Sequence, residues 1–233
     1  MQPEAQQNPS SFGQAGGIAL QQNRVLRNTY WLLAVTLIPT AIGALVGANM
    51  NMSFLRSSPI VSSIAILAIF YGWTYAIEKN RDSALGVGLL LGFTLFLGLL
   101  LGPLLQSIMG LRNGGQLVAM AAGGTALTFF GLSAVASSTK RDFSNMGKFL
   151  AVGGIVIMIA VLANIFLKIP ALSLTLMVAF IIFSSLVILW QINSIVRGGE
   201  TNYVSATLTL YVSLYNIFSS LLQLLGIFGG NKD

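Results

Sequence analysis

The sequence predicts an all-α integral membrane protein with seven transmembrane helices, and three observations support this fold class. Hydrophobic residues make up 55% of the 233 positions and charged residues only 8%, whereas soluble domains carry about 25% charged residues. The mean hydropathy of the chain is +0.82. Seven apolar segments follow one another between short polar stretches, and each is close to the length of about 20 residues that a helix needs to cross a bilayer.

The seven spans follow a polar amino-terminal segment of different composition. We expect the spans at about residues 28–48, 57–77, 83–105, 115–137, 147–168, 170–192 and 202–227. The first 23 residues are rich in Gln, Asn, Ser, Gly and Pro and predict a disordered tail, because they offer no apolar face to bury. The apolar run after them is too long for the core of a signal peptide, which indicates a retained first span and a membrane domain over residues 24–233. "KIPAL" separates the fifth and sixth spans, and its Pro170 predicts a tight turn and a helical hairpin.

The basic residues predict the orientation of the chain in the membrane. On the side of the amino terminus lie Arg24, Arg27, Lys79, Arg81, Lys140, Arg141, Lys148 and Arg197; on the other side lie Arg56, Arg112, Lys168 and Lys232. This count of eight against four places the amino terminus in the cytoplasm and the carboxyl terminus in the periplasm. The net charge of +6 is spread between the spans rather than gathered on one face, so we expect no nucleic-acid partner.

Small residues recur at a spacing of four within the spans. "GLLLG" occurs at residues 88–92 and again at 98–102, and "AMAAGGTA" sets Ala119 and Gly123 four apart. Such spacing lets helix backbones approach closely in lipid. We expect these motifs to pack helices within one chain rather than to form a dimer interface.

Polar side chains form a narrow stripe along the last span. They recur three or four residues apart, so they share one helical face: Asn202, Ser205, Thr209, Ser213, Asn216, Ser220 and Gln223. One interpretation is hydrogen bonding between helices, and the other is a water-filled pathway through the bundle. The sequence favours the first interpretation. Both require the stripe to face inward. Ser184 and Gln191 share a face of the sixth span and are candidates to meet the stripe, and Asn164 of the fifth span is expected to be a packing amide.

The charged residues limit the chemistry that the chain can perform. All six acids lie in tails or at loop edges: Glu4, Glu78, Asp82, Asp142, Glu200 and Asp233. Cysteine and histidine are absent, which excludes disulfides, thiolate nucleophiles, histidine relays, and zinc or haem sites with those ligands. With no paired carboxylates for acid–base catalysis, we expect no enzymatic activity, no metal site and no cofactor.

Opposite charges at the cytoplasmic rim could pair between two loops. Glu78 and Arg81 lie in "EKNRD", and Arg197 and Glu200 lie in "RGGE". A latch of this kind is usually a solvated contact worth less than about 1 kcal/mol.

Several strings of this chain resemble the Bax inhibitor-1 family, also called the transmembrane Bax inhibitor motif family. "GGETNYVSATLTLYVSLYNIFSSLLQLLG" is similar to the carboxy-terminal signature of the family. "RVLRNTY", "LGPLL", "MAAGGTALTFFG" and "ANIFLKIPAL" resemble its bacterial YccA-like branch, so the resemblance covers nearly everything after residue 23. It implies seven helices with the last one central and surrounded by the other six, in a bacterial inner membrane. It also implies modulation of the membrane-anchored AAA protease FtsH, or calcium leak; other members protect against cell death.

The chain departs from the family at two positions. Leak-competent relatives carry a pair of acids, proposed to sense pH, at positions that match Gln191 and Ser213 here, and neither of these residues can ionise. The resemblance therefore implies neither a carboxylate pH sensor nor calcium leak in its usual form. If the sixth and seventh helices meet, a neutral Gln191–Ser213 hydrogen bond is expected in place of the pair. Our leading hypothesis is a regulator of the protease; the alternative is a cation leak channel along the polar last helix, with Ca²⁺ as the candidate ion. The central polar contacts would be Gln191, Ser213, Asn216, Thr209, Ser220 and Ser184.

Overall fold

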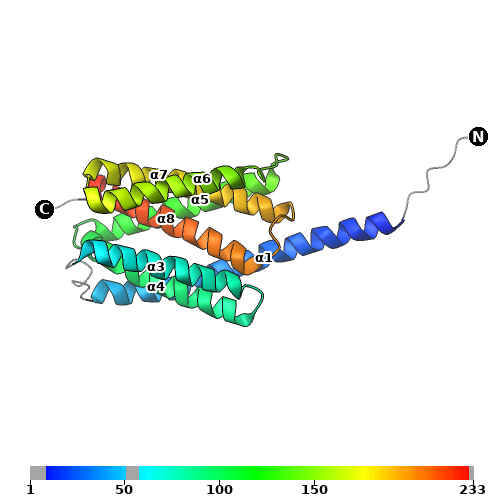
Figure 1. The fold of residues 1–233 in the computed structure, drawn as a ribbon, viewed down its shortest axis with the longest axis horizontal. Helices are drawn as coiled ribbons and strands as arrows, with labels where there is room; N and C mark the ends of the chain where they lie inside the picture. The colour runs from blue at the N-terminus through cyan, green and yellow to red at the C-terminus, as the bar shows by residue number, and fades with distance from the viewer. Residues whose placement is uncertain (1–8, 51–57, 231–233) are drawn as a thin grey trace, which may run out of the picture.

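The described part of the protein is a bundle of seven long α-helices. The computed structural model describes residues 9–50 and 58–230, with side chains from Leu20 onward. The helices are α1 (Pro9–Asn49), α3 (Pro59–Lys79), α4 (Ala84–Met109), α5 (Gly114–Ser138), α6 (Met146–Leu167), α7 (Pro170–Val196) and α8 (Tyr203–Gly229). Each contains a stretch long and apolar enough to cross a membrane. Most of them lie roughly along the long axis of the bundle, and α8 crosses it obliquely (Figure 1). The prediction of seven membrane-spanning helices is confirmed.

The first helix begins earlier than the sequence predicts. α1 starts at Pro9, and its membrane-crossing stretch is Leu20–Asn49, so residues 9–23 are helical where we expected disorder. The expectation for residues 1–8 lies outside the described residues. The difference has a physical reason: starting a helix is costly, but extending one adds a hydrogen bond for each residue fixed. The amino-terminal turns of α1 extend beyond the end of the bundle (Figure 1).

The turn between α6 and α7 forms the predicted helical hairpin. Lys168 ends α6 in the left-handed conformation at φ 51°, and Pro170 begins α7, where its missing N–H costs no helical bond. Asn164 spans the turn: its Nδ2 donates to Ser173 Oγ over 2.8 Å, and its Oδ1 accepts from the Ile169 N–H over 3.2 Å. Its amide therefore packs the hairpin, as expected.

The last helix lies between the other helices, but not all of them touch it. α8 contacts α1, α3, α4, α5 and α7, whereas α6 packs on α7 and α3 without reaching α8 in the part of the chain described. Figure 1 shows α8 crossing between the α5–α6–α7 side and the α1–α3–α4 side. The expectation that six helices surround the last one is therefore corrected to five. Between Lys148 near its start and Asn164 near its end, α6 is apolar and buries only Leu150, so it can remain on the outside, where lipid solvates it.

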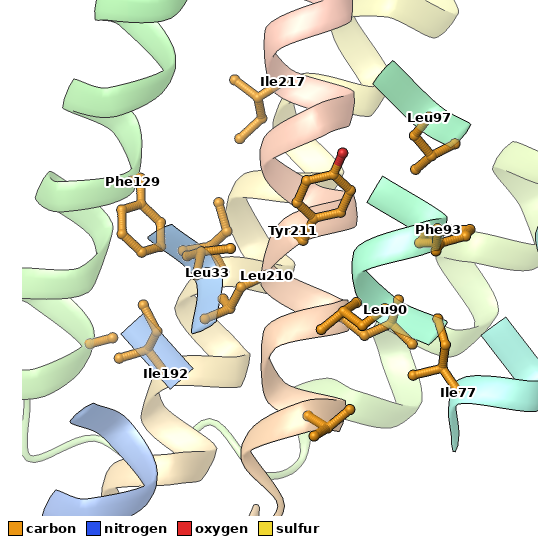
Figure 2. Packing of buried hydrophobic residues seen from close by; sticks show 14 residues of the cluster. Leu33, Ile77, Leu90, Phe93, Leu97, Phe129, Ile192, Leu210, Tyr211 and Ile217 are labelled. Atoms are coloured by element: carbon orange, nitrogen blue, oxygen red, sulfur yellow. The ribbon is translucent and has the colours of Figure 1, made fainter. Parts of the chain in front are cut away.

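The core of the bundle gathers around α8. Figure 2 shows members of this cluster from six helices: Leu33, Ile77, Leu90, Phe93, Leu97, Phe129, Ile192, Leu210, Tyr211 and Ile217. Lipid tails are as apolar as these side chains, so close packing rather than escape from water holds them together. The polar stripe of α8 must therefore find its partners among the neighbouring helices or at the bundle ends.

Glycines bring α1 and α4 into backbone contact. Gly98 and Gly102, which the second "GLLLG" predicts as a packing motif, lie against the backbones of Thr40 and Gly47, respectively. Gly43 on α1 meets the α4 backbone in the same way. A Cβ on any of these glycines would collide with main-chain atoms that cannot move aside, so the interface depends on their missing side chains. The α1 half of this motif, "GALVG", was not singled out from the sequence.

The other small-residue motifs do not pack as expected. Gly92 meets only the Trp73 side chain, at 3.1 Å from the position of a Cβ, and Gly88 has nothing within 4 Å of that position. Gly123 is equally open, and Ala119 is exposed. The prediction of internal packing is wrong for Gly88, Ala119 and Gly123, because a spacing of four shows that residues share a face but not which way that face points.

Candidate functional site

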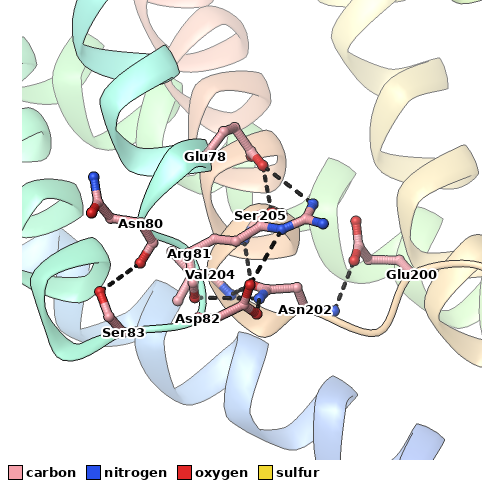
Figure 3. Close-up of polar contacts among 9 residues, drawn as sticks. All are labelled: Glu78, Asn80, Arg81, Asp82, Ser83, Glu200, Asn202, Val204 and Ser205. Atoms are coloured by element: carbon pink, nitrogen blue, oxygen red, sulfur yellow. Dashed lines mark hydrogen bonds and ion pairs between the residues drawn. The ribbon is translucent and has the colours of Figure 1, made fainter.

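The polar stripe of α8 begins with Asn202, which joins the start of this helix to the turn between α3 and α4. Its Oδ1 caps the helix by accepting from the N–H groups of Val204 (2.8 Å) and Ser205 (3.1 Å). Its Nδ2 donates to Asp82 Oδ1 over 2.7 Å and to the Arg81 carbonyl over 3.2 Å (Figure 3). One amide therefore both starts α8 and attaches it to a turn 120 residues away in sequence.

Ser205, the next member of the stripe, makes a second attachment, to the last turn of α3. Its hydroxyl donates to Glu78 Oε2 over 2.7 Å, and Arg81 lies 3.5 Å from that carboxylate oxygen. Glu200 completes the group, because its Oε1 accepts from the backbone N–H of Asn202 over 2.8 Å. Figure 3 shows these residues gathered around the first turn of α8.

The four rim residues of the expected charge latch do not pair across the two loops. The ion pairs among the described residues join Arg81 to Glu78 (3.5 Å) and to Asp82 (4.0 Å), both within one turn. Arg197 instead donates to the Lys140 carbonyl, and Glu200 accepts from the backbone. The latch is therefore corrected: neutral Asn202 and Ser205 connect the loops. The side chains of Arg81 and Glu78 are 48% and 40% exposed, so their pair contributes less than about 1 kcal/mol.

The middle of the stripe is satisfied within its own helix. The Ser213 hydroxyl donates to the Thr209 carbonyl over 2.8 Å, a local bond that serine commonly makes in helices. Gln191 Nε2 has no hydrogen-bond partner among the described residues. The expected Gln191–Ser213 hydrogen bond is therefore not formed. Farther along, Asn216 is half-buried and Ser220 is buried.

Two predicted residues of α7 carry buried polar atoms without partners, and one unpredicted residue of α5, Ser133, places its buried hydroxyl beside that of Tyr30. These atoms are Ser184 Oγ, Gln191 Nε2 and Ser133 Oγ, in the part of the chain that the structure describes. The residues are only 1%, 2% and 8% exposed, respectively. Ser184 and Gln191 thus face inward, as the sequence predicts, but without direct bonds to the α8 stripe. Ser133 was missed because a single serine in an apolar span has no pattern around it.

Tyr211 makes the polar contact that links three helices, although it does not belong to the polar stripe of α8. Its hydroxyl lies 2.7 Å from Thr40 Oγ1 of α1 and 3.3 Å from the Thr94 carbonyl oxygen of α4. Thr40 Oγ1 is also 2.8 Å from the Thr36 carbonyl oxygen. A buried tyrosine hydroxyl usually finds a partner, which is the signal that would have identified this contact.

Asn193 holds the α5–α6 connection against the end of α7. Its Nδ2 donates to the carbonyls of Ala136 (3.4 Å) and Arg141 (3.3 Å), and its Oδ1 accepts from the Phe143 N–H (3.1 Å). In the same connection, hydrogen bonds from the hydroxyl and N–H of Ser144 lower the pKa of Asp142. The sequence pointed to Gln191 in this part of α7, but Asn193, two residues on, makes these bonds.

The interior of the bundle therefore offers amides and hydroxyls rather than charges. No group of three or more Asp, Glu, His or Cys residues that could hold a metal ion occurs within residues 9–50 and 58–230. The fold and its polar contacts define a polytopic helical membrane protein whose last helix is anchored at one end by hydrogen bonds from neutral side chains to carboxylates and contacted along its length by five neighbours.

Comparison with known proteins identifies the family. Residues 22–230 match the family model described as "Inhibitor of apoptosis-promoting Bax1", and the chain belongs to the Bax inhibitor-1 family. An uncharacterized protein of Neisseria meningitidis is 46% identical over 88% of this chain and 92% of its own length. The "Modulator of FtsH protease YccA" of Escherichia coli K12 is 44% identical over 89% of this chain and 91% of its own length. In another E. coli strain, the matching relative is named "Inner membrane protein YccA". The family and YccA-like resemblances are confirmed.

Proposed function

We propose that this protein is an inner-membrane regulator of a membrane-anchored AAA protease of the FtsH type. The observation that carries this proposal is the 44% identity with the E. coli modulator, which extends over 89% of this chain and 91% of that protein. A regulator needs binding surfaces rather than catalytic groups, and the polar contacts described above bind helices and loops to one another.

The first helix supports this proposal. α1 continues beyond the end of the bundle, and its Leu20 side chain is 72% exposed. A AAA protease draws its substrates in from an accessible segment, and a chain end that projects from the bundle is suited to that contact. The backbone packing of α1 against α4 then connects any pull on the amino-terminal end to the most closely packed interface of the bundle.

The proposed orientation places the amino-terminal extension in the cytoplasm. On the same side would lie the α3–α4 turn with Arg81, the α5–α6 connection with Arg141 and the α7–α8 loop with Arg197. This arrangement follows the excess of basic residues on one side of the spans. The cytoplasmic face would then present three connections whose conformations are held by Asn193 and Asn202.

The alternative, a calcium or cation leak channel, has weaker support. Ca²⁺ prefers carboxylate oxygens, and the acid that falls within a described spanning helix, Glu78, lies at the very end of α3. At the two positions where leak-competent relatives carry acids, Ser213 bonds within its own helix and Gln191 is neutral. These features favour the regulator.

The proposal is tested by combining this protein with the E. coli FtsH protease in reconstituted membranes. We expect the tagged protein to retain the protease on affinity purification and to change the rate at which it degrades a standard membrane substrate. Deleting residues 1–19 should slow turnover of this protein while leaving the thermal unfolding of the bundle unchanged. Liposomes that hold this protein alone provide the contrasting assay. Calcium flux without any retention of protease would overturn the proposal and support the channel.

A further inference from the structure

A groove opens between α7 and α8 at the end of the bundle where α7 begins and α8 ends (Figure 1). Its volume is about 490 Å³, and its apolar walls are formed by Leu174, Val178, Ala179 and Ile182 of α7 and by Leu224 and Phe228 of α8. Val178, Ile182 and Phe228 are 47%, 58% and 76% exposed, respectively. Because both helices are long and apolar enough to cross a membrane, these side chains and the groove between them face lipid.

The lining of the groove suits hydrocarbon rather than a polar ligand. Among the described residues that line it, Thr175 carries the polar side chain, and its hydroxyl donates to the Ala171 carbonyl over 2.9 Å within the same helix. A polar ligand would have to give up its own hydrogen bonds to enter, which is costly, whereas an apolar chain would lose none.

The length of the groove favours a lipid chain over a second spanning helix. From Leu174 to Ile182 the α7 wall is about 12 Å long at 1.5 Å per residue. This is less than half of the roughly 30 Å thickness of the hydrocarbon core. A spanning helix crosses the whole core, so most of its length would lie outside the groove. The part of an acyl chain next to its headgroup fits a short groove at one end of the bundle.

Two basic residues lie at this same end of the bundle. Lys168 ends α6 and precedes Leu174 by six residues. On the side of α8, Asn113 Nδ2 donates to the Gly229 carbonyl over 2.6 Å, which places its neighbour Arg112 beside the end of that helix. One cation is therefore close to the start of α7, and the other is close to the end of α8.

Neither cation is neutralised by the described part of the protein. Both side chains are exposed, and the ion pairs among the described residues all involve Arg81 at the opposite end. The acids of the described chain also lie at that opposite end: Glu78, Asp82, Asp142 and Glu200. An anionic group at the mouth of the groove would therefore meet two unpaired positive charges.

We propose that the groove between α7 and α8 binds an acyl chain of an anionic phospholipid whose phosphate group lies near Arg112 and Lys168. Hydrocarbon fills the apolar groove, and the headgroup supplies the negative charge that this end of the described bundle lacks. The inference is independent of the proposed regulatory function.

Photo-labelling of the full chain in phosphatidylcholine nanodiscs tests this inference. One probe is phosphatidylglycerol with a diazirine in an acyl chain, and the matched probe is phosphatidylcholine with the same chain. We expect the anionic probe to label the peptides that contain residues 174–182 and 224–228 several-fold more than the zwitterionic probe. Equal labelling by the two probes would overturn the inference, because the groove would then hold ordinary bilayer lipid only.

Two sets of variants separate the charge from the groove. Arg112→Gln combined with Lys168→Gln should abolish the preference for the anionic probe, whereas Lys148→Gln, at an exposed position near the opposite end, should keep it. Ala179→Phe fills the groove and should reduce labelling several-fold, whereas Ala119→Phe, on an exposed face of α5, should not. Thermal unfolding confirms that each variant is folded. A preference that persists without both cations would contradict the proposed headgroup contact.

A second copy of this chain is the competing occupant of the groove. The sequence contains no cysteine, so Val178→Cys provides a single site for disulfide cross-linking. Leu127→Cys is the control, because Leu127 is 77% exposed on α5, away from the groove. We expect no more dimer from Val178→Cys than from Leu127→Cys in oxidised membranes. A several-fold excess of dimer from Val178→Cys would place a second copy in the groove and overturn the inference.

Discussion

The hydroxyl of Ser205 donates a 2.7 Å hydrogen bond to the carboxylate of Glu78, which joins the first turn of α8 to the end of α3 across 127 residues of sequence. Together with the amide of Asn202, it positions α8 at one end of the bundle. Because a charged acceptor strengthens a hydrogen bond, these two neutral side chains hold the loops more firmly than the exposed ion pairs beside them.

Replacing Asn202 should therefore destabilise the bundle. Asn202→Ala removes the cap of α8, worth about 0.5–2 kcal/mol, together with the two bonds to the α3–α4 turn. Asn202→Ser is the matched control, because serine retains a capping oxygen but has no Nδ2 donor. We expect the unfolding midpoint to fall for alanine and to fall less for serine. Equal midpoints for alanine and the native protein would show that the cap and its loop contacts contribute nothing.

Gly102→Ala should disrupt the α1–α4 interface. A methyl group there meets the Gly47 backbone, which cannot move aside as a flexible side chain can. Overpacking of this kind costs about 1–3 kcal/mol. Gly88→Ala, on the same helix but with nothing within 4 Å, should be neutral or slightly stabilising. Thermal unfolding in detergent measures both changes, and a similar loss in the two variants would contradict the proposed role of the interface.

Tyr211→Phe removes the hydroxyl that α8 offers to Thr40 and to the Thr94 carbonyl. Hydrogen bonds between membrane helices average about 0.6 kcal/mol, so we expect a small but measurable loss of stability. Tyr75→Phe is the control, because that side chain is 68% exposed and should tolerate the change. A double variant with Thr40→Val should lose less than the sum of the two single changes, and full additivity would show that the two hydroxyls do not interact.

Reporter fusions at the two ends should show opposite sidedness. Seven membrane-spanning helices and the excess of basic residues on one side predict that Met1 lies in the cytoplasm and Asp233 in the periplasm. Alkaline phosphatase fused after Asp233 should be active, and the same enzyme fused before Met1 should be inactive. Signals from the same side would mean that one helix does not cross the membrane.

Any calcium flux through the native protein should be weak and nearly independent of pH between roughly pH 6 and 8, because Gln191 and Ser213 do not ionise. Gln191→Asp combined with Ser213→Asp introduces two carboxylates into a low-dielectric interior, where burial and mutual repulsion raise at least one apparent pKa. We expect this variant to gain a pH-dependent component in liposome flux, with Gln191→Asn and Ser213→Thr as the neutral control. Steep titration of the native flux would assign the sensor to another group.

The sequence alone determined the membrane class, the seven spans and the α6–α7 hairpin. Hydropathy summed over about 20 residues is a local property, and Pro170 acts on its immediate neighbours, so neither depends on where distant helices lie. Periodicity also identified Ser184 and Gln191 as inward-facing. The two residues lie seven apart on one helical face, and a face with polar side chains is expected to point away from lipid.

Only the tertiary structure decided which partner each polar side chain finds. Spacing along a helix places residues on a common face. Which residues lie opposite that face depends on helices distant in sequence and on the rotation of each helix about its axis. For this reason, Ser205 bonds to Glu78, Tyr211 reaches Thr40 and Gln191 finds no protein partner. The same physical cause separates Gly98 and Gly102, which meet α1, from Gly88 and Gly123, which meet nothing, although all four occur in motifs of the same spacing.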